Sequence, residues 1–191
     1  MQMRNTPGPL FHFLIASGLL LASFAMCEFF HLFDPTHRHP HPRPEVHMLF
    51  VPHGMIVLLA WIYGWIMVPL LLPAMLLSSA YIVGPEHMTP TVALLTLSRL
   101  VLVMIAMEAM KLVCCDARRD GGRAGVMALF AAGTLATLTF NVLRMAYSPC
   151  CEMMTLAERV MTYAMAVAAD LAGLVIVMLG AMFLFRALRH G

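Results

Sequence analysis

The chain has 191 residues, of which 61% are hydrophobic and only 12% are charged. A soluble domain carries about a quarter charged residues, so this composition indicates an integral membrane protein and leaves no room for a soluble catalytic domain. The formal net charge of +2 is too small to indicate nucleic-acid binding.

Long apolar stretches separated by polar loops predict an all-α fold, a single domain made of a bundle of six transmembrane helices. The expected spans are residues 11–33, 48–63, 66–83, 91–115, 123–147 and 156–187. The first stretch is too long for the apolar part of a signal peptide, and no small-residue cleavage site follows it. We therefore expect it to be a retained helix.

The second and third spans come from one apolar run, because no charged residue occurs from Met48 to Val83. At about 1.5 Å per residue, this run is too long for one crossing of a hydrocarbon core about 30 Å thick. We expect two helices joined by a tight turn near Gly64, with Pro69 and Pro73 starting or kinking the second helix. If the two helices merged, the chain would have five spans.

Basic residues predict which ends of the spans face the cytoplasm. They cluster between the fourth and fifth spans and after the sixth, at Lys111, Arg118, Arg119, Arg123, Arg186 and Arg189. The positive-inside rule places both regions in the cytoplasm, as expected for a bacterial inner membrane. With six spans the N-terminus is also cytoplasmic, whereas five spans would separate the termini. Four arginines would lie on the outer side of the membrane in this topology and count against it: Arg38, Arg43, Arg144 and Arg159.

The loops on the outer side carry side chains that can ligate a metal ion. Residues 34–47 form a His- and Pro-rich loop, and proline keeps such a segment extended. Imidazole suits zinc, copper or nickel, and nearby sulfur favours copper. The candidate ligands are His37, His39, His41, His47, His87, Cys150 and Cys151. No cofactor is certain, and copper and zinc are the metals to test. The alternative is a solvated loop whose histidines sense protons.

Charged residues also lie inside expected spans, at Arg99 and Glu108 in the fourth and at Asp170 in the sixth. A charge near the bilayer centre is costly and usually finds a partner inside the bundle. Counted from the outer ends, Arg99 lies ~12 Å deep and Asp170 ~21 Å deep, a gap that an arginine side chain partly bridges. The spacing is compatible with an Arg99–Asp170 pair but does not require one, and the pair would be either a structural ion pair or part of a ligand pocket or proton path.

Small residues around Asp170 predict close helix packing, because Ala166, Ala169, Gly173 and Gly180 recur at helical spacing. The fifth span repeats the pattern with Gly125, Ala128, Ala132 and Ala136. We expect both spans to pack into the bundle.

Pro52-His-Gly starts an apolar helix that ends at Gly64, and Pro69-Leu-Leu-Leu-Pro follows it. Together with Ala169-Asp-Leu-Ala-Gly173, these motifs resemble bacterial membrane-associated sensor (MASE-type) domains. The resemblance implies a multi-span bundle that senses a small ligand, or a related substrate-binding subunit of a vitamin-type importer. Sensors of that family carry a cytoplasmic output domain, whereas this sequence stops just after Arg189. A separate partner would then supply the output. The histidine-rich loop has no match in the family.

The leading hypothesis is a non-enzymatic inner-membrane protein that binds a small ligand or transition-metal ion from the outer side, as a sensor or transport subunit. Pro52, His53 and Gly54 would shape the pocket mouth, and Arg99 with Asp170 its polar floor. The expected partners are the lipid bilayer and a separate membrane, signalling or energising protein. The alternative is a structural accessory subunit or assembly factor of a larger membrane complex. Recognisable catalytic motifs are absent, which disfavours an intramembrane enzyme.

Overall fold

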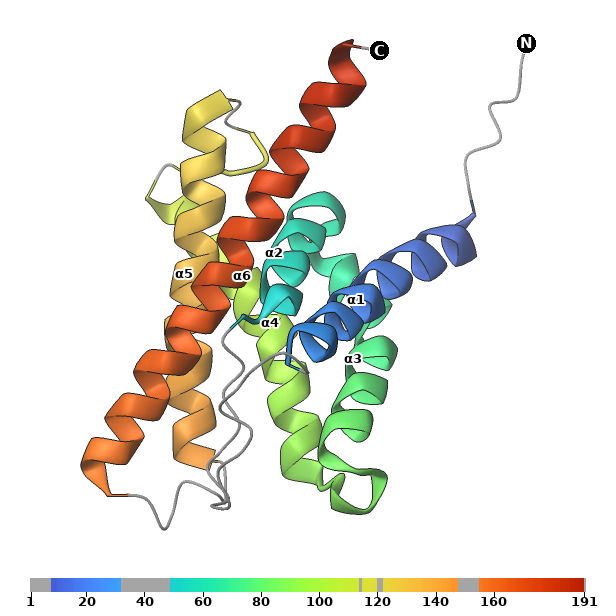
Figure 1. Cartoon of the computed structure of the whole chain (residues 1–191). Coiled ribbons are helices and arrows are strands. Elements are labelled where there is room, and N and C mark those ends of the chain that lie inside the picture. Colours follow the sequence, from blue (N-terminus) through green and yellow to red (C-terminus); the bar gives the residue numbers. More distant parts are fainter. Residues whose placement is uncertain (1–7, 32–48, 114, 120–121, 148–154, 191) are drawn as a thin grey trace.

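A computed structural model of the chain describes residues 8–31, 49–113, 115–119, 122–147 and 155–190 (Figure 1). The described residues form α1 (Pro9–His31), α2 (Val51–Tyr63), α3 (Met67–Val83), α4 (Pro90–Leu112), α5 (Gly122–Tyr147) and α6 (Leu156–His190), with 3-10 turns η2 (Gly64–Ile66) and η3 (Pro85–His87). No strand occurs in these ranges. The all-α expectation is confirmed, and the helix boundaries follow the expected spans closely.

Five helices in the described part of the chain are long and apolar enough to cross a membrane. They are Pro9–Phe29, Val51–Val83, Pro90–Leu112, Gly122–Tyr147 and Leu156–Leu188. The second combines α2, η2 and α3 into one stretch of 33 residues. The chain therefore has the helices of a multi-pass membrane protein.

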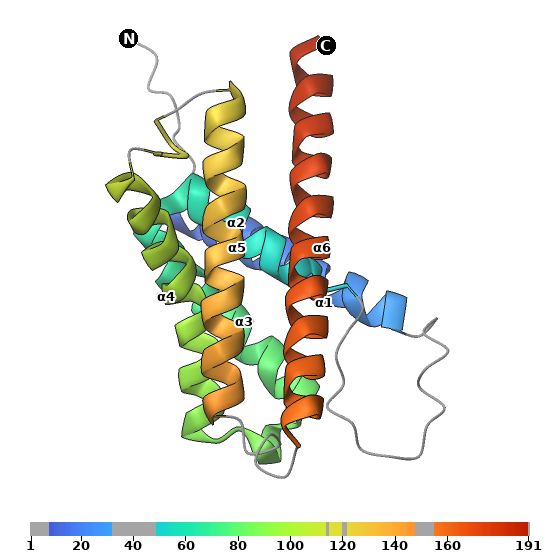
Figure 2. The same cartoon turned by 90° about the vertical axis from the view of Figure 1, so that its left-hand side faces the viewer.

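The helical stretch breaks at Gly64, as the sequence predicted. Gly64 ends α2 with φ 64° and ψ −147°, and its N–H donates to the carbonyl of Ala60. A residue with a side chain is strained in this conformation, so glycine suits the position. One 3-10 turn follows before α3 begins. The chain changes direction sharply here, and α2 and α3 extend from the turn at an angle to each other (Figures 1 and 2).

The helices do not all run along one axis. α5 and α6 run side by side along the length of the bundle, while α1 and α2 cross them obliquely (Figure 2). α2 begins beside the middle of α6, where the N–H of Phe50 donates to the carbonyl of Ala169 at 3.1 Å. The first turn of α2 is therefore surrounded by protein rather than placed at an end of the bundle.

The main apolar core surrounds α2. It includes Ile56 and Val57 of α2, Leu100 and Met104 of α4, and Leu174 of α6, all of them buried. Large apolar side chains also cover the outer surface, which is expected where helices face lipid. Examples on the last helix are Ile176, Leu179, Met182 and Phe183.

The C-terminal end of α2 meets the connection between α4 and α5. Arg118 in that connection donates from Nη2 to the carbonyl of Ala60 at 2.6 Å and from Nε to the carbonyl of Trp61 at 3.2 Å. In return, the indole Nε1 of Trp61 donates to the carbonyl of Ala117 at 2.7 Å. The turn at Gly64 and the α4–α5 connection therefore lie at the same end of the bundle.

Candidate functional site

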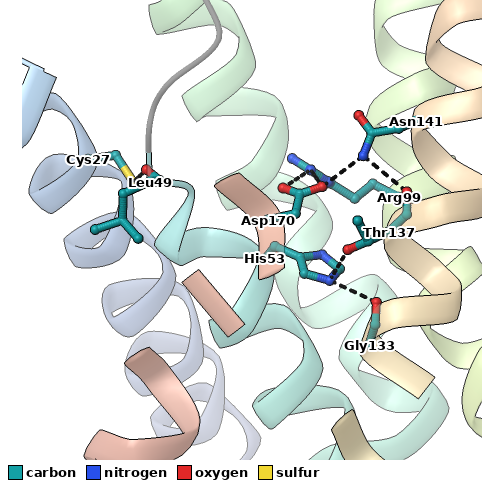
Figure 3. Close-up of polar contacts among 8 residues, drawn as sticks. All are labelled: Cys27, Leu49, His53, Arg99, Gly133, Thr137, Asn141 and Asp170. Carbon is teal, nitrogen blue, oxygen red and sulfur yellow. Dashed lines mark hydrogen bonds and ion pairs between the residues drawn. The ribbon is translucent and has the colours of Figure 1, made fainter. Parts of the chain in front are cut away.

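Polar side chains from four helices converge beside the start of α2 (Figure 3). This polar cluster consists of His53 on α2, Arg99 on α4, Thr137 and Asn141 on α5, and Asp170 on α6. All are buried except Arg99, whose side chain is 12% exposed. Polar groups at this position in a membrane bundle are costly unless they are paired, so their partners define what the cluster can do.

An ion pair joins α4 to α6 at the centre of the cluster. Arg99 Nη2 donates to Asp170 Oδ1 at 2.8 Å and to Asp170 Oδ2 at 3.0 Å. Asn141 Nδ2 also donates to Asp170 Oδ2 at 3.0 Å and to the carbonyl of Thr137 at 3.0 Å. The aspartate thus accepts hydrogen bonds from two helices, which offsets part of the free energy of removing its charge from water.

Two aromatic rings cover the guanidinium of Arg99. Its Cζ atom lies 4.3 Å from the ring centroid of Phe50 and 4.4 Å from that of Phe140. Both contacts are within the range of favourable cation–π interactions. The N–H bonds of the guanidinium lie in its plane, so a further acceptor would bond to it along its edge.

His53 connects α2 to α5. Its Nε2 lies 3.1 Å from the carbonyl oxygen of Gly133 and 2.7 Å from Oγ1 of Thr137. A carbonyl oxygen only accepts, so a hydrogen bond to Gly133 requires the hydrogen of the neutral ring to be on Nε2, where the Thr137 oxygen shares it. In the neutral ring the other nitrogen, Nδ1, then carries a lone pair and accepts hydrogen bonds.

Two nitrogen atoms of the cluster have no hydrogen-bond partner within the described residues: His53 Nδ1 and Arg99 Nε. Both atoms are buried, and His53 as a whole is 1% exposed. Leaving a buried polar atom unpaired costs about 1–3 kcal/mol, and more for a charged group. Such an exception in a well-packed interior requires an explanation, for example a water molecule or a ligand.

Glycines bring the start of α2 against α6 and so position His53. A Cβ atom on Gly173 would collide with the carbonyl of Phe50, and one on Gly54 would lie 2.6 Å from the carbonyl of Gly173. Pro52 is in the first turn of α2, where its missing N–H and fixed φ are compatible with a helix. The Pro-His-Gly sequence therefore holds the imidazole at the crossing of two backbones.

The expected pair of Arg99 and Asp170 is present, and His53 lies in the same cluster. Pro52 and Gly54 are buried where α2 packs on α6. Glu108, the other charge expected inside the fourth span, instead pairs with Lys111 at 2.8 Å in the last turns of α4, where both side chains are partly exposed.

Sequence reasoning did not assign Thr137, Phe50 or Phe140 to the site and did not connect Asn141 with Asp170. A signal was present in α5, because Gly133, Thr137 and Asn141 recur every four residues and share one helix face. The aromatic rings gave no comparable signal, since apolar residues occur throughout these spans.

The metal ligands predicted for the outer loops cannot be placed together. His37, His39, His41, His47, Cys150 and Cys151 lie outside the described residues. His87 is described; its side chain is 70% exposed, and its Nε2 lies 3.8 Å from Glu86 Oε1. Across the described ranges, no group of three or more His, Cys, Asp and Glu side chains is arranged to hold a metal ion.

No family model, characterised protein or solved structure shows significant similarity to this chain. The geometry and chemistry of the polar cluster are therefore the basis for assigning a function.

Proposed function

We propose that this chain is a non-enzymatic inner-membrane protein of bacteria that binds a small ligand at the polar cluster, as a sensor or as a transport subunit. The observation that supports the proposal is the pair of unsatisfied nitrogens, His53 Nδ1 and Arg99 Nε. A cluster that served only to fasten helices would gain stability by satisfying both. A ligand that offers a donor to His53 and an acceptor to Arg99 would satisfy them on binding.

The ligand enters from the outer side in this proposal, and a separate membrane or signalling protein provides the output. The resemblance to MASE-type sensor domains supports this assignment, because its motifs include His53 and Asp170, which belong to the polar cluster. The charge balance supports small polar ligands in particular: the Arg99–Asp170 pair is already neutral as a unit, so a ligand need not bring a compensating charge.

Ligand screening with a matched pair of variants tests this function. The thermal stability of the purified protein in detergent would be measured against a panel of small polar metabolites. A compound bound at the cluster raises the midpoint of unfolding of the wild type and of Thr139→Val, whose hydroxyl bonds only within α5. The same compound has no effect on His53→Phe. Compounds that stabilise all three proteins equally, or a panel without any stabilising compound, would count against the proposal.

The metal-binding version of the function concerns the outer loops and needs its own test. We propose that the histidines of residues 34–47 take up copper or zinc, since alternating imidazoles are suitable ligands. Titration of the purified protein with copper, zinc and nickel would be compared with a variant that lacks residues 35–46. Equal metal affinities of the two proteins would rule out metal binding by this loop.

The proposed topology has six crossings with both termini in the cytoplasm. In this arrangement the Gly64 turn and the α4–α5 connection face the same side, and the contact of Arg118 with Ala60 and Trp61 supports it. The last turn of α6 lies toward this end of the bundle as well (Figure 1). The positive-inside rule then assigns the end that carries Arg118 and Arg119 to the cytoplasm.

A structural role in a larger membrane complex is the second candidate. The last turns of α6 expose apolar side chains on several sides, including Met182, Phe183, Leu184 and Phe185. A partner helix could pack there in place of lipid. Purification in mild detergent that yielded only a monomer without an additional chain would argue against this role.

A further inference from the structure

Helix α2 is held at its two ends by different polar contacts. At its first turn, His53 contacts Thr137 and Gly133 of α5 (Figure 3). At its last turn, Arg118 and Ala117 of the α4–α5 connection bond the backbone and the indole of Trp61. The contacts among Ala60, Trp61, Ala117 and Arg118 are called the Arg118 junction below. α2 has 13 residues, so the whole helix is about 20 Å long.

The Arg118 junction adds side-chain donors to carbonyl groups in the last turn of α2. Arg118 Nε donates to the carbonyl of Trp61, and Nη2 is a second donor to the carbonyl of Ala60, which also accepts from the N–H of Gly64. A cation at this end also interacts favourably with the helix dipole. The positioning of α2 therefore depends on Arg118, which is far away in the sequence, as well as on the polar cluster.

Between its ends, α2 has features that allow it to move as one piece. It crosses α6 at Gly54 and Gly173, where the two backbones are in direct contact, so a shift of the first turn is passed along the helix and not absorbed by intervening side chains. Beyond its last residue, Gly64 has a positive φ and separates it from α3. Small shifts of packed helices, with the change absorbed at a few terminal residues, are a common form of conformational coupling.

We propose that α2 couples the polar cluster to the Arg118 junction, so that loosening the contacts of His53 also loosens the contacts of Trp61 and Arg118. The inference rests on the proposed function only for the identity of the natural trigger, a ligand at the polar cluster. The junction lies at the end of the bundle that the proposed topology places in the cytoplasm. α2 would therefore carry a change in the interior to a surface that an output protein can contact.

The forward test uses Trp61 as the reporter. The chain has 2 tryptophans, and Trp65→Phe leaves Trp61 alone. In this background, Thr137→Val removes the hydroxyl that lies 2.7 Å from His53 Nε2. Thr139→Val is the matched control, because its hydroxyl bonds to Leu135 on the same helix. We expect Thr137→Val to raise the acrylamide quenching constant of Trp61 about twofold or more and the control to leave it unchanged.

The reverse test perturbs the junction and measures the other end. The Cys27 thiol is buried and donates to the carbonyl of Leu49, just before α2 begins (Figure 3). Arg118→Gln weakens the junction, and Arg119→Gln is a control with the same change of charge at the neighbouring exposed residue. We expect the rate of Cys27 alkylation by N-ethylmaleimide, followed by mass spectrometry of its peptide, to rise about twofold or more in Arg118→Gln only.

Coupling is reciprocal, so both tests must agree. Wild-type behaviour of Trp61 in Thr137→Val and of Cys27 in Arg118→Gln overturns the proposal, and so do equal effects in the control variants. If Thr137→Val does not fold, Thr137→Ala, which removes the same hydroxyl without placing a second methyl group beside His53, replaces it. Neither test uses a ligand. Failure of the coupling therefore leaves the binding proposal standing, and failure of the ligand screen leaves the coupling measurable.

Discussion

Arg99 holds Asp170 with a single nitrogen. Its Nη2 donates to both carboxylate oxygens, at 2.8 Å and 3.0 Å, while its Nε has no partner in the described part of the chain. An arginine can instead bind a carboxylate with two parallel N–H bonds from neighbouring nitrogens, which is the stronger arrangement. The observed contact joins α4 to α6 and leaves one edge of the guanidinium free for another group.

Removing one partner of this pair should destabilise the protein more than removing both. Arg99→Met or Asp170→Leu leaves an uncompensated charge in the interior, and breaking a buried pair in this way costs about 3–5 kcal/mol. The double variant Arg99→Met/Asp170→Leu removes both charges, so we expect it to lose less than the sum of the two single variants. The free energy of unfolding in mixed micelles measures all three.

The pair of Glu108 and Lys111 is the control for this prediction. Both of its side chains are more than a third exposed, and partly exposed pairs contribute about 0–1 kcal/mol. We expect Glu108→Gln to change the free energy of unfolding by no more than that amount. If Asp170→Leu destabilised the protein no more than Glu108→Gln, the polar cluster would not be a buried network.

Two glycines of α6 should respond differently to alanine. Gly173→Ala places a methyl group against the backbone of Phe50, and overpacking of this kind costs about 1–3 kcal/mol. Gly180 has open space around its Cβ position, so Gly180→Ala should be neutral or stabilise the helix by up to about 1 kcal/mol. Thermal unfolding compares them. Equal midpoints would show that α2 and α6 are not in close contact at Gly173.

The two tryptophans beside the Gly64 turn provide another comparison. Trp61→Phe loses the hydrogen bond to the carbonyl of Ala117, and we expect it to lower the free energy of unfolding by about 1 kcal/mol. Trp65 is 49% exposed, and Trp65→Phe should have a smaller effect. Chemical unfolding followed by circular dichroism measures both without depending on tryptophan emission. A larger loss in Trp65→Phe would contradict the assigned role of Trp61.

Reporter fusions test the topology. Green fluorescent protein fluoresces when it is fused on the cytoplasmic side, and alkaline phosphatase is active when it is fused on the outer side. We expect phosphatase activity for fusions after His87 and fluorescence for fusions after Arg119, because the two positions follow α3 and α4 on opposite sides of the membrane. Fluorescence at both positions would mean that α4 does not cross the membrane.

Much of the fold was predictable from local sequence. Apolar length determined the helices, and the glycine and prolines around Gly64 predicted the break between α2 and α3, because backbone preferences act within a few residues. The pairing of Arg99 with Asp170 was also foreseeable, since an isolated charge inside a membrane bundle is strongly unfavourable. These inferences need only the composition of a segment and the properties of the bilayer.

Other features depended on contacts between residues far apart in the sequence. Apolar length and backbone preferences do not predict the oblique path of α2. They also do not predict that the rings of Phe50 and Phe140 cover Arg99, or that Arg118 contacts Trp61. Each arises from how whole helices pack, and many different packings satisfy the same apolar pattern. Sequence alone therefore determined an all-helical protein with helices long and apolar enough to span a membrane and a break at Gly64, and it indicated that Arg99 and Asp170 could pair without requiring it. The sequence put His53 at the mouth of a pocket with that pair as its floor. Only the tertiary structure showed that His53 is buried within the cluster itself, because the crossing of Gly54 on Gly173 sets where α2 begins.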